Sequence, residues 1–186
     1  AKALLYIEKA LKRFIDIIGS IVGIILLIPL SIGIKIANIK AKDYGPLFYK
    51  QKRIGKNGKI IKLYKFRSMV INAEELIKSF TPEQMREYKE NYKLTNDPRI
   101  TKVGKFLRKT SLDELPQLIN IINGDLSIIG PRPVVADELE KYGVNKDKFL
   151  SVTPGLTGYW AANGRSNTTY EQRMEMELYY IDNLSL

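Results

Sequence analysis

The chain of 186 residues contains no histidine and no cysteine. Those absences exclude a Ser-His-Asp triad, a cysteine nucleophile and a zinc site built from His and Cys. They also exclude a disulfide framework, and the lack of cysteine fits a reducing compartment. Acid–base or covalent chemistry in this protein must therefore use Asp, Glu, Lys, Tyr, Ser or Thr.

Acidic residues are scarce in the first third of the chain. Residues 1–67 hold 15 Lys and Arg but 3 Asp and Glu, whereas residues 68–186 hold 15 and 17. The net charge of +10 is therefore local, and one acid, Asp43, accompanies 11 basic side chains within residues 35–67. Such a block calls for an anionic partner, either the anionic leaflet of a membrane or a nucleic acid.

One long stretch carries almost no charge. Phe14–Ile34 has 21 residues with a single ionisable side chain, Asp16, and about 20 apolar residues span a bilayer core. The stretch has no polar side, which disfavours a core helix of a soluble protein, and no small-residue cleavage site follows it, which disfavours a signal peptide. A membrane segment next to the basic block favours the membrane leaflet over nucleic acid as the partner.

Lys and Arg flank this segment on both sides. Basic flanks favour the cytoplasmic side, so we expect both ends there. Pro29 disrupts a helix, and an arm over residues 12–28 would rise only roughly 25 Å. We therefore expect a re-entrant hairpin of helix, break near Pro29 and helix, with Asp16 paired to Lys12 or Arg13. A single crossing of the membrane is the alternative.

The rest of the chain alternates short elements. Leu47–Phe66 is predicted to be a β-hairpin, because two β-prone runs surround Asn57-Gly58. Val152–Arg165 is predicted to be a Gly-rich loop, and Asp97 and Asp125 are predicted to be turn residues. Helices are predicted over Asn72–Phe80, Pro82–Leu94 (with Thr81 as cap), Ile100–Lys109, a short stretch from Leu115 to Ile122, Pro133–Tyr142 and Tyr170–Ile181. The fold class is α+β, mostly helical with a small β-hairpin.

Two adjacent acids, Asp113 and Glu114, begin an apolar run that ends in Pro131-Arg132-Pro133. Spacing alone favours a capping box, with Ser111 as N-cap and Glu114 at N3. The surroundings favour chemistry instead, because Arg108 precedes the acids, and cations near a helix N-terminus bind phosphate. A carboxylate there can serve as metal ligand or nucleophile, and its neighbour as base. Consecutive helix positions do not face each other, so the two acids would divide these roles.

Three longer blocks stand out: Arg53–Met69 (RIGKNGKIIKLYKFRSM), Arg99–Pro133 (RITKVGKFLRKTSLDELPQLINIINGDLSIIGPRP) and Pro154–Ser166 (PGLTGYWAANGRS). Together with Lys12–Ser20 (KRFIDIIGS), they are spread in order over nearly the whole length of the chain. In these blocks and their order, the chain closely resembles the bacterial sugar transferases, the monotopic phosphoglycosyl transferases.

The resemblance implies a monotopic enzyme on the cytoplasmic face of the bacterial inner membrane. Residues 1–42 would form the re-entrant membrane hairpin, and residues 43–186 the cytoplasmic catalytic domain. The enzyme would move a sugar-1-phosphate from a UDP-sugar to a polyprenol phosphate such as undecaprenyl phosphate, releasing UMP. That step starts a membrane glycan (exopolysaccharide, capsule, O-antigen or glycoprotein glycan). The implied partners are the two substrates and the anionic leaflet, with no nucleic acid; the transferred sugar and the oligomeric state, a homo-oligomer included, stay open.

The resemblance also implies roles for particular residues. Asp113 would attack the sugar-bearing phosphate, form a covalent aspartyl-phosphosugar intermediate and contact Mg²⁺, the implied cofactor. Glu114 would act as base for the incoming lipid phosphate. The phosphate-binding site would comprise Pro131, Arg132, Pro133 and Arg108, with Arg132 holding the phosphate oxygens and Arg108 as a second candidate. Further candidates for nucleotide or sugar binding, each with a solvated face or a simple turn as the alternative, are Lys65, Arg67, Ser68, Asn163 and Arg165; Trp160 is expected either at the membrane interface or against the sugar.

Two other functions stay open on the sequence. One is a membrane-tethered module that binds nucleic acid or anionic lipid, in which the acids only cap a helix. The other is a glycosyltransferase that releases UDP. Many family members carry a multi-span membrane region and a further domain ahead of this unit, and commonly continue beyond its last residues. We therefore expect either a small-form enzyme or an excised catalytic region.

Overall fold

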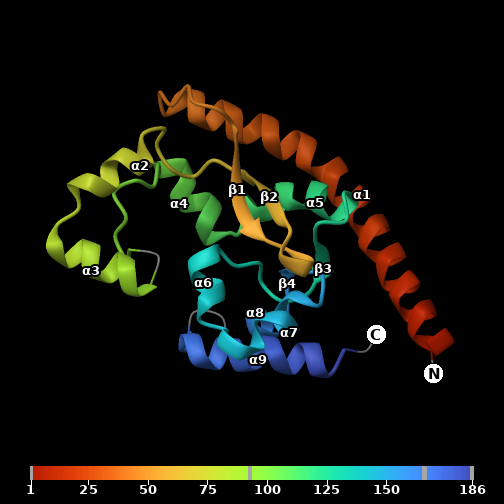
Figure 1. The fold of residues 1–186 in the computed structure, drawn as a ribbon. Coiled ribbons are helices and arrows are strands. Elements are labelled where there is room, and N and C mark those ends of the chain that lie inside the picture. The colour runs from red at the N-terminus through yellow and green to blue at the C-terminus, as the bar shows by residue number, and fades with distance from the viewer. Residues whose placement is uncertain (1, 92–93, 165–166, 185–186) are drawn as a thin grey trace. The chain divides into compact units, whose positions relative to one another are not determined.

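The structure is a computed structural model that describes residues 2–91, 94–164 and 167–184 (Figure 1). Its contacts divide the chain into two compact units. Unit 1 comprises Ala1–Ile28, Lys50–Lys65 and Glu114–Leu186, and unit 2 comprises Pro29–Tyr49 and Phe66–Asp113. The division into a membrane hairpin over residues 1–42 and a catalytic domain over 43–186 stays a prediction.

The N-terminal helix α1 spans Lys2–Lys40 and contains Pro29. It is helical throughout, so the two separate helices expected from the sequence are one helix in the structure. A proline inside a long helix removes one backbone hydrogen bond and can bend the helix without ending it. The re-entrant path through a bilayer stays a prediction.

The surface of α1 is inverted relative to a helix of a soluble protein. Its buried residues include the polar Asp16, Ser20 and Asn38, and only 17% of its most apolar 18-residue window is buried. The exposed side chains include many large apolar ones: Phe14, Ile15, Ile18, Ile21, Val22, Ile25, Leu26, Ile28, Ile32, Ile36 and Ile39. By length and composition α1 could cross a membrane, and this exposed apolar surface indicates membrane association.

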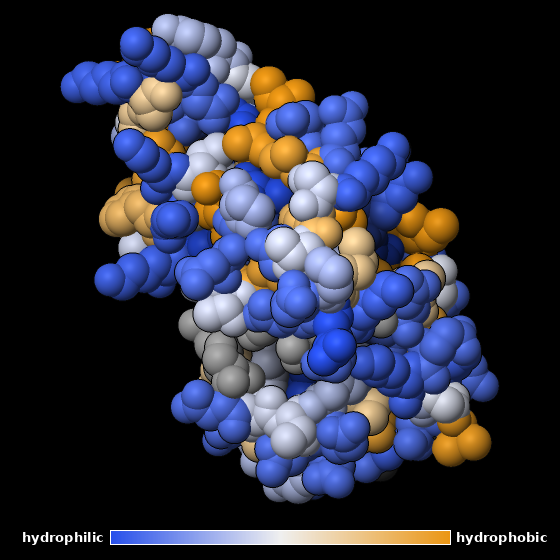
Figure 2. All heavy atoms as spheres, turned by 90° about the vertical axis from the view of Figure 1, so that its left-hand side faces the viewer, coloured by the Kyte–Doolittle hydropathy of each residue, from blue (hydrophilic) through white to orange (hydrophobic). Residues whose placement is uncertain are grey.

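The surface differs in character elsewhere. Figure 2 shows one face of the molecule on which hydrophilic side chains predominate and apolar ones form small, separate groups. Such a face suits contact with water, because isolated apolar side chains are normal on soluble surfaces.

The expected hairpin is confirmed. The strands β1 (Phe48–Ile54) and β2 (Ile60–Phe66) form a small two-stranded antiparallel sheet. A short 3₁₀ turn, η1 (Lys56–Gly58), joins them. In it Asn57 has a φ of 56° and Gly58 a φ of 79°, the left-handed conformation that these two residue types adopt most readily.

The main core of unit 1 lies between β2 and α5 (Leu118–Ile122). Ile61 and Leu63 of the strand pack with Leu118 and Ile121 of the helix, and all four are buried. Around them lie Leu126 and the partly buried Ile24, Ile128 and Leu156. The short helix ends at Ile122, where the sequence predicted its end, with Asn123 as C-cap. Gly124 follows with a φ of 83°, which is a common helix end.

A second small sheet was not expected. β3 (Ser127–Ile129) pairs in parallel with β4 (Gly155–Thr157). The prediction of a plain loop over Val152–Arg165 is wrong, because that range contains β4 and the helix α8 (Tyr159–Asn163). A Cβ on Gly155 would lie 2.1 Å from the backbone nitrogen of Gly130. The glycine is needed there for close approach of two backbones, which sequence alone does not distinguish from a flexible loop.

The C-terminal part of unit 1 is helical. It contains α6 (Ala136–Glu140), η4 (Gly143–Asn145), α7 (Lys146–Leu150) and α9 (Tyr170–Asp182). Both α7 and α8 lie beside α9 (Figure 1). Their core contains Val134, Tyr142 and Phe149. The helix predicted over Pro133–Tyr142 is confirmed only in its central five residues. The final helix, predicted over Tyr170–Ile181, is confirmed in full and extends to Asp182.

Unit 2 contains α2 (Ala73–Leu76), η2 (Ile77–Ser79), α3 (Pro82–Asn91) and α4 (Lys102–Lys109). Thr81 exchanges hydrogen bonds with Gln84 at the start of α3, which confirms the predicted cap. Asp97 accepts a hydrogen bond from the backbone of Arg99 and also forms a buried ion pair of 2.7 Å with its guanidinium. It is thus a turn residue, as predicted, and a structural anchor as well.

Candidate active site

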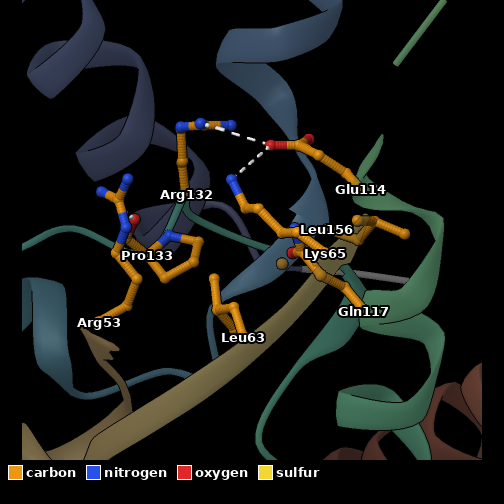
Figure 3. A pocket seen from close by; sticks show the side chains of 9 residues that line it. Arg53, Leu63, Lys65, Glu114, Gln117, Arg132, Pro133 and Leu156 are labelled. Atoms are coloured by element: carbon orange, nitrogen blue, oxygen red, sulfur yellow. Dashed lines mark hydrogen bonds and ion pairs between the residues drawn. The ribbon is translucent and has the colours of Figure 1, made fainter. Parts of the chain in front are cut away.

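Unit 1 holds a polar pocket built around Glu114 (Figure 3). Oε1 of Glu114 lies 3.3 Å from Nζ of Lys65 and 3.6 Å from Nη2 of Arg132. Figure 3 shows both cationic side chains pointing toward this carboxylate. The lining residues are Arg53, Leu63, Lys65, Glu114, Gln117, Arg132, Pro133, Gly155 and Leu156. The structure therefore brings together four of the predicted site residues: Lys65 from β2, Glu114 from η3 (Leu112–Gln117), and Arg132 and Pro133 from the segment after β3.

Asn120 fixes the spacing between Lys65 and Glu114. Its side chain is fully buried; it accepts a hydrogen bond from the backbone of Tyr64 at 2.9 Å and donates one to the carbonyl of Lys62 at 2.9 Å. The Asn120 side-chain amide thus bonds one backbone N–H and one backbone carbonyl of β2, the two groups that a neighbouring strand would bond. α5 is thereby attached to β2 one residue before Lys65.

The Pro-Arg-Pro segment is held from both sides. Pro131 is fully buried, and its carbonyl accepts a hydrogen bond from the backbone of Gly155 at 2.8 Å. Just beyond the segment, Val134 accepts one from Ile54 at 2.8 Å. The three sequence blocks that carry the family resemblance thus meet at this segment, which leaves Arg132 with its side chain 37% exposed beside the pocket.

Arg53 was missed by the sequence analysis. Its side chain lines the pocket, and its Nη1 donates to Glu138 Oε2 at 3.2 Å and to the Pro133 carbonyl at 3.4 Å. Burial lowers the pKa of Arg53 from its ordinary value, although arginine keeps its charge in proteins. Arg53 is the first residue of Arg53–Met69, one of the blocks that carry the family resemblance. That position was the only feature of the sequence that pointed to Arg53 as a site residue.

Gln117 was also missed. It is buried, lines the pocket and has no hydrogen bond from its side-chain amide to any part of the chain that the structure describes. A buried amide that faces a pocket offers a ligand both a donor and an acceptor. It lies three residues after Glu114 in the 3₁₀ helix η3, and side chains three residues apart lie on one side of such a helix. That spacing is the signal that could have pointed to Gln117.

Arg67 lies in unit 2 and is fully engaged there. Its guanidinium donates to the Pro46 carbonyl, the Met69 carbonyl and the Asp43 carboxylate, each at 2.7 Å. The hydrogen bond from Arg67 lowers the pKa of Asp43. These contacts give Arg67 a structural role, and nucleotide binding by Arg67 stays a prediction.

Two predicted site residues, Arg108 and Ser68, contact each other in unit 2. Nε of Arg108 donates to the Ser68 hydroxyl at 2.9 Å. In unit 1, Asn163 donates to the Tyr159 carbonyl at 2.8 Å, and Arg165 lies outside the described residues. Ligand binding by these four residues stays a prediction.

Trp160 makes two contacts within the protein. Its Nε1 donates to Thr168 at 2.8 Å, and Arg173 lies 4.8 Å from its ring centroid. These contacts hold the ring against α9. Neither the membrane interface nor the sugar is needed to account for its position.

The local geometry at the acids does not fit a capping box. Ser111 has a φ of 57°, whereas an N-cap residue is normally extended. Glu114 lies within ion-pair distance of two cations. Asp113 precedes it in the 3₁₀ helix η3 and is partly exposed.

The acidic side chains of the structure limit the kind of metal site that it can form. Across the described residues no group of three or more acidic, His or Cys side chains could hold a metal ion. Mg²⁺, however, commonly takes one or two carboxylates and completes its shell with water and substrate phosphates. A site at Asp113 therefore fits Mg²⁺ bound together with a nucleotide, and does not fit a permanent structural ion.

Comparison with known proteins shows the family to which the chain belongs. A family profile described as bacterial sugar transferase matches residues 7–186. The undecaprenyl-phosphate galactose phosphotransferase of Salmonella typhimurium is 45% identical over 184 residues, which are 96% of this chain and 38% of that protein. The exopolysaccharide production protein ExoY of Sinorhizobium fredii is 44% identical, with 94% and 78% covered.

A third relative is the UDP-glucose:undecaprenyl-phosphate glucose-1-phosphate transferase of Escherichia coli. It is 37% identical over 183 residues, which are 94% of this chain and 37% of that protein. The chain thus spans well under half the length of two of these relatives, and most of the third.

Proposed function

Because the chain belongs to the bacterial sugar transferase family, we propose that it transfers a sugar-1-phosphate from a UDP-sugar to a polyprenol phosphate and releases UMP. Names of relatives support both substrates: two refer to undecaprenyl phosphate and one of these to UDP-glucose. The product would be the first lipid-linked intermediate of a membrane glycan.

The observation that carries the proposal is the cationic pocket at Glu114. Lys65 and Arg132 contact its carboxylate, and Arg53 lines the same pocket. Cations held beside an acid in a small pocket are ready to accept phosphate oxygens in its place, and arginine suits phosphate because its donors are fixed in a fork. The diphosphate of the donor is the ligand that this arrangement fits.

In the first half-reaction, a carboxylate oxygen of Asp113 attacks the phosphorus atom that bears the sugar. A new P–O bond forms to Asp113, the P–O bond to UMP breaks, and UMP leaves with the electron pair. Arg132 and Lys65 stabilise the charge on the phosphoryl oxygens. The product is an aspartyl-phosphosugar, a mixed anhydride between the Asp113 carboxyl group and the sugar phosphate.

In the second half-reaction, an oxygen of the polyprenol phosphate attacks the same phosphorus atom, and Asp113 leaves as a carboxylate. Glu114 accepts the proton of the incoming phosphate if that oxygen still carries one. Two successive steps keep the bulky nucleotide and the bulky lipid from occupying the pocket together.

Mg²⁺ would be held by Asp113 together with phosphate oxygens of the donor. When bound, the ion offsets the repulsion between the anionic nucleophile and the diphosphate.

The position of the protein at the membrane follows from α1. Its exposed apolar side chains indicate membrane association, and we propose that it re-enters the cytoplasmic leaflet of the inner membrane rather than crossing it. The basic block would then face anionic headgroups. A water-soluble donor and a lipid acceptor could both reach a site at that level.

The test is to incubate the purified protein in detergent with Mg²⁺, undecaprenyl phosphate and radiolabelled UDP-sugars, beginning with UDP-galactose and UDP-glucose. We expect the sugar to appear in the lipid phase and UMP to be released. Release of UDP would replace the proposal with a glycosyltransferase. No release with any donor, together with retention on anionic vesicles, would replace it with a binding module.

A further inference from the structure

α9 carries a buried carboxyl group that the proposed chemistry does not use. Glu177 is 1% exposed, and burial raises its pKa from the ordinary value. Its Oε2 has no hydrogen-bond partner in the described part of the chain. Burying a carboxyl group costs free energy unless hydrogen bonds or charged partners compensate it, so its single hydrogen bond within the described residues is informative.

That contact is the backbone of Arg132. Glu177 Oε1 accepts a hydrogen bond from the Arg132 N–H at 3.0 Å. Proline has no backbone N–H, so within residues 131–133 this is the only main-chain donor available. Glu177 is not among the residues that line the pocket. It can therefore influence a ligand only through the segment that presents Arg132.

We propose that Glu177 is a positioning residue of the phosphate pocket: by accepting the one N–H of Pro131-Arg132-Pro133, it sets the direction in which the Arg132 guanidinium points. The inference rests on the proposed function, in which Arg132 binds the donor diphosphate. It also explains why a hydrogen-bond acceptor is buried on α9, since an apolar side chain at this position would leave the Arg132 N–H without an acceptor.

A parallel arrangement supports the same role for α9. Arg173, one turn before Glu177, lies 3.6 Å from Glu138 Oε1, and Glu138 in turn holds the pocket residue Arg53 at 3.2 Å. Two pocket cations are thus attached to the same helix, one directly and one through an intermediate acid. The side of α9 that carries residues 173 and 177 acts as a rigid support for the pocket.

The test measures binding of UDP, in the presence of Mg²⁺, to the full chain in detergent by calorimetry. Glu177→Met removes the acceptor at similar volume, and we expect the Kd for UDP to rise about tenfold. Glu177→Gln keeps an oxygen at this position, so its Kd should stay within about twofold of wild type. Glu175→Met removes an exposed acid from the same helix and is the matched control, expected to bind as wild type.

The decisive comparison is made in an Arg132→Ala background. If Glu177 acts through Arg132, Arg132→Ala weakens UDP binding and Glu177→Met adds nothing further, because the side chain that it positions is gone. With the UDP-sugar as substrate, Glu177→Met alone should raise KM more than it lowers kcat. A further loss in the Arg132→Ala background, or an equal loss in Glu177→Gln, would show general damage and overturn the inference.

Two outcomes concern the proposed function itself. If wild type does not bind UDP, or Arg132→Ala does not weaken binding, the pocket assignment fails and the inference fails with it. If both hold but Glu177→Met binds as wild type, only the inference fails. Should Glu177→Met lose its cooperative thermal transition, Glu177→Asp withdraws the acceptor by one methylene group and is expected to weaken binding in the same direction.

Discussion

Two arginine–acid pairs in this protein differ in how tightly the arginine is held, Arg67 with Asp43 and Arg132 with Glu114. In unit 2, Arg67 is 6% exposed and makes three hydrogen bonds of 2.7 Å, one of them to Asp43. In unit 1, Arg132 is 37% exposed and lies 3.6 Å from Glu114, at the distance of a loose ion pair. Short, saturated contacts indicate a cation that holds the fold, whereas a loose, accessible pair indicates a cation that can exchange its partner for a ligand.

The largest effect is expected at Asp113. Asp113→Asn removes the nucleophile, so the rate of UMP release should fall on the order of 10⁴-fold, measured by the labelled-sugar assay. The thermal midpoint should stay close to wild type because Asp113 is partly exposed. Asp147→Asn, an exposed acid on α7, is the matched control and should keep full activity. Near-normal turnover in Asp113→Asn would show that the nucleophile assignment is wrong.

Next in size is the loss of the saturated pair. Arg67→Met leaves Asp43 and two backbone carbonyls without their donor, so the free energy of unfolding should fall by about 3 kcal/mol. Chemical denaturation measures this change. Arg86→Met on the exposed side of α3 should change it by less than about 0.5 kcal/mol. Unchanged stability in Arg67→Met would remove the distinction between the two pairs.

The converse result is expected for the loose pair. Arg132→Ala should raise the Kd for UDP about 10- to 100-fold, the loss of one charged hydrogen-bonding partner. Its free energy of unfolding should change by less than about 1 kcal/mol, because the side chain is accessible and Lys65 still pairs with Glu114. Arg86→Ala serves as control. A variant that is strongly destabilised yet binds UDP normally would assign Arg132 to the fold.

The smallest effect is a dependence on pH. The hydrogen bond from Arg67 lowers the pKa of Asp43 below its ordinary value of 3.8. The folded state therefore binds fewer protons at this site than the unfolded state, and stability falls with pH below about pH 4. Denaturation at several pH values should show that Arg67→Met loses less stability than wild type in this acid range. Parallel curves for the two proteins would contradict the assignment.

Part of the site could be predicted from the sequence. Glu114 and Arg132 stand in a run whose residue types suit phosphate, and Lys65 lies in a block with a recognisable resemblance. Arg67 stands two residues from Lys65 in the same block, and nothing in the sequence separates the pocket residue from the structural one. The difference arises from tertiary contacts, since the carbonyls of Pro46 and Met69 happen to surround Arg67.

The fold was predictable where local signals are strong. Asn57-Gly58 predicts the hairpin turn, and Thr81-Pro82 predicts the start of α3. The prediction over Val152–Arg165 was wrong because Gly155 permits a backbone contact with Gly130, and that partner is 25 residues away in the chain. Pro29 was expected to divide a helix that is continuous in the structure, since one proline in a long apolar helix costs a single hydrogen bond.

The Pro-Arg-Pro segment also has a spectroscopic consequence. Residues 131–133 contribute one amide proton between them, that of Arg132, because proline has none. This proton is hydrogen-bonded to a buried acceptor and should exchange slowly with solvent. In a proton–nitrogen correlation spectrum, a single resonance therefore reports on the phosphate-binding segment, and titration with nucleotide can be followed at one peak without labelling the ligand.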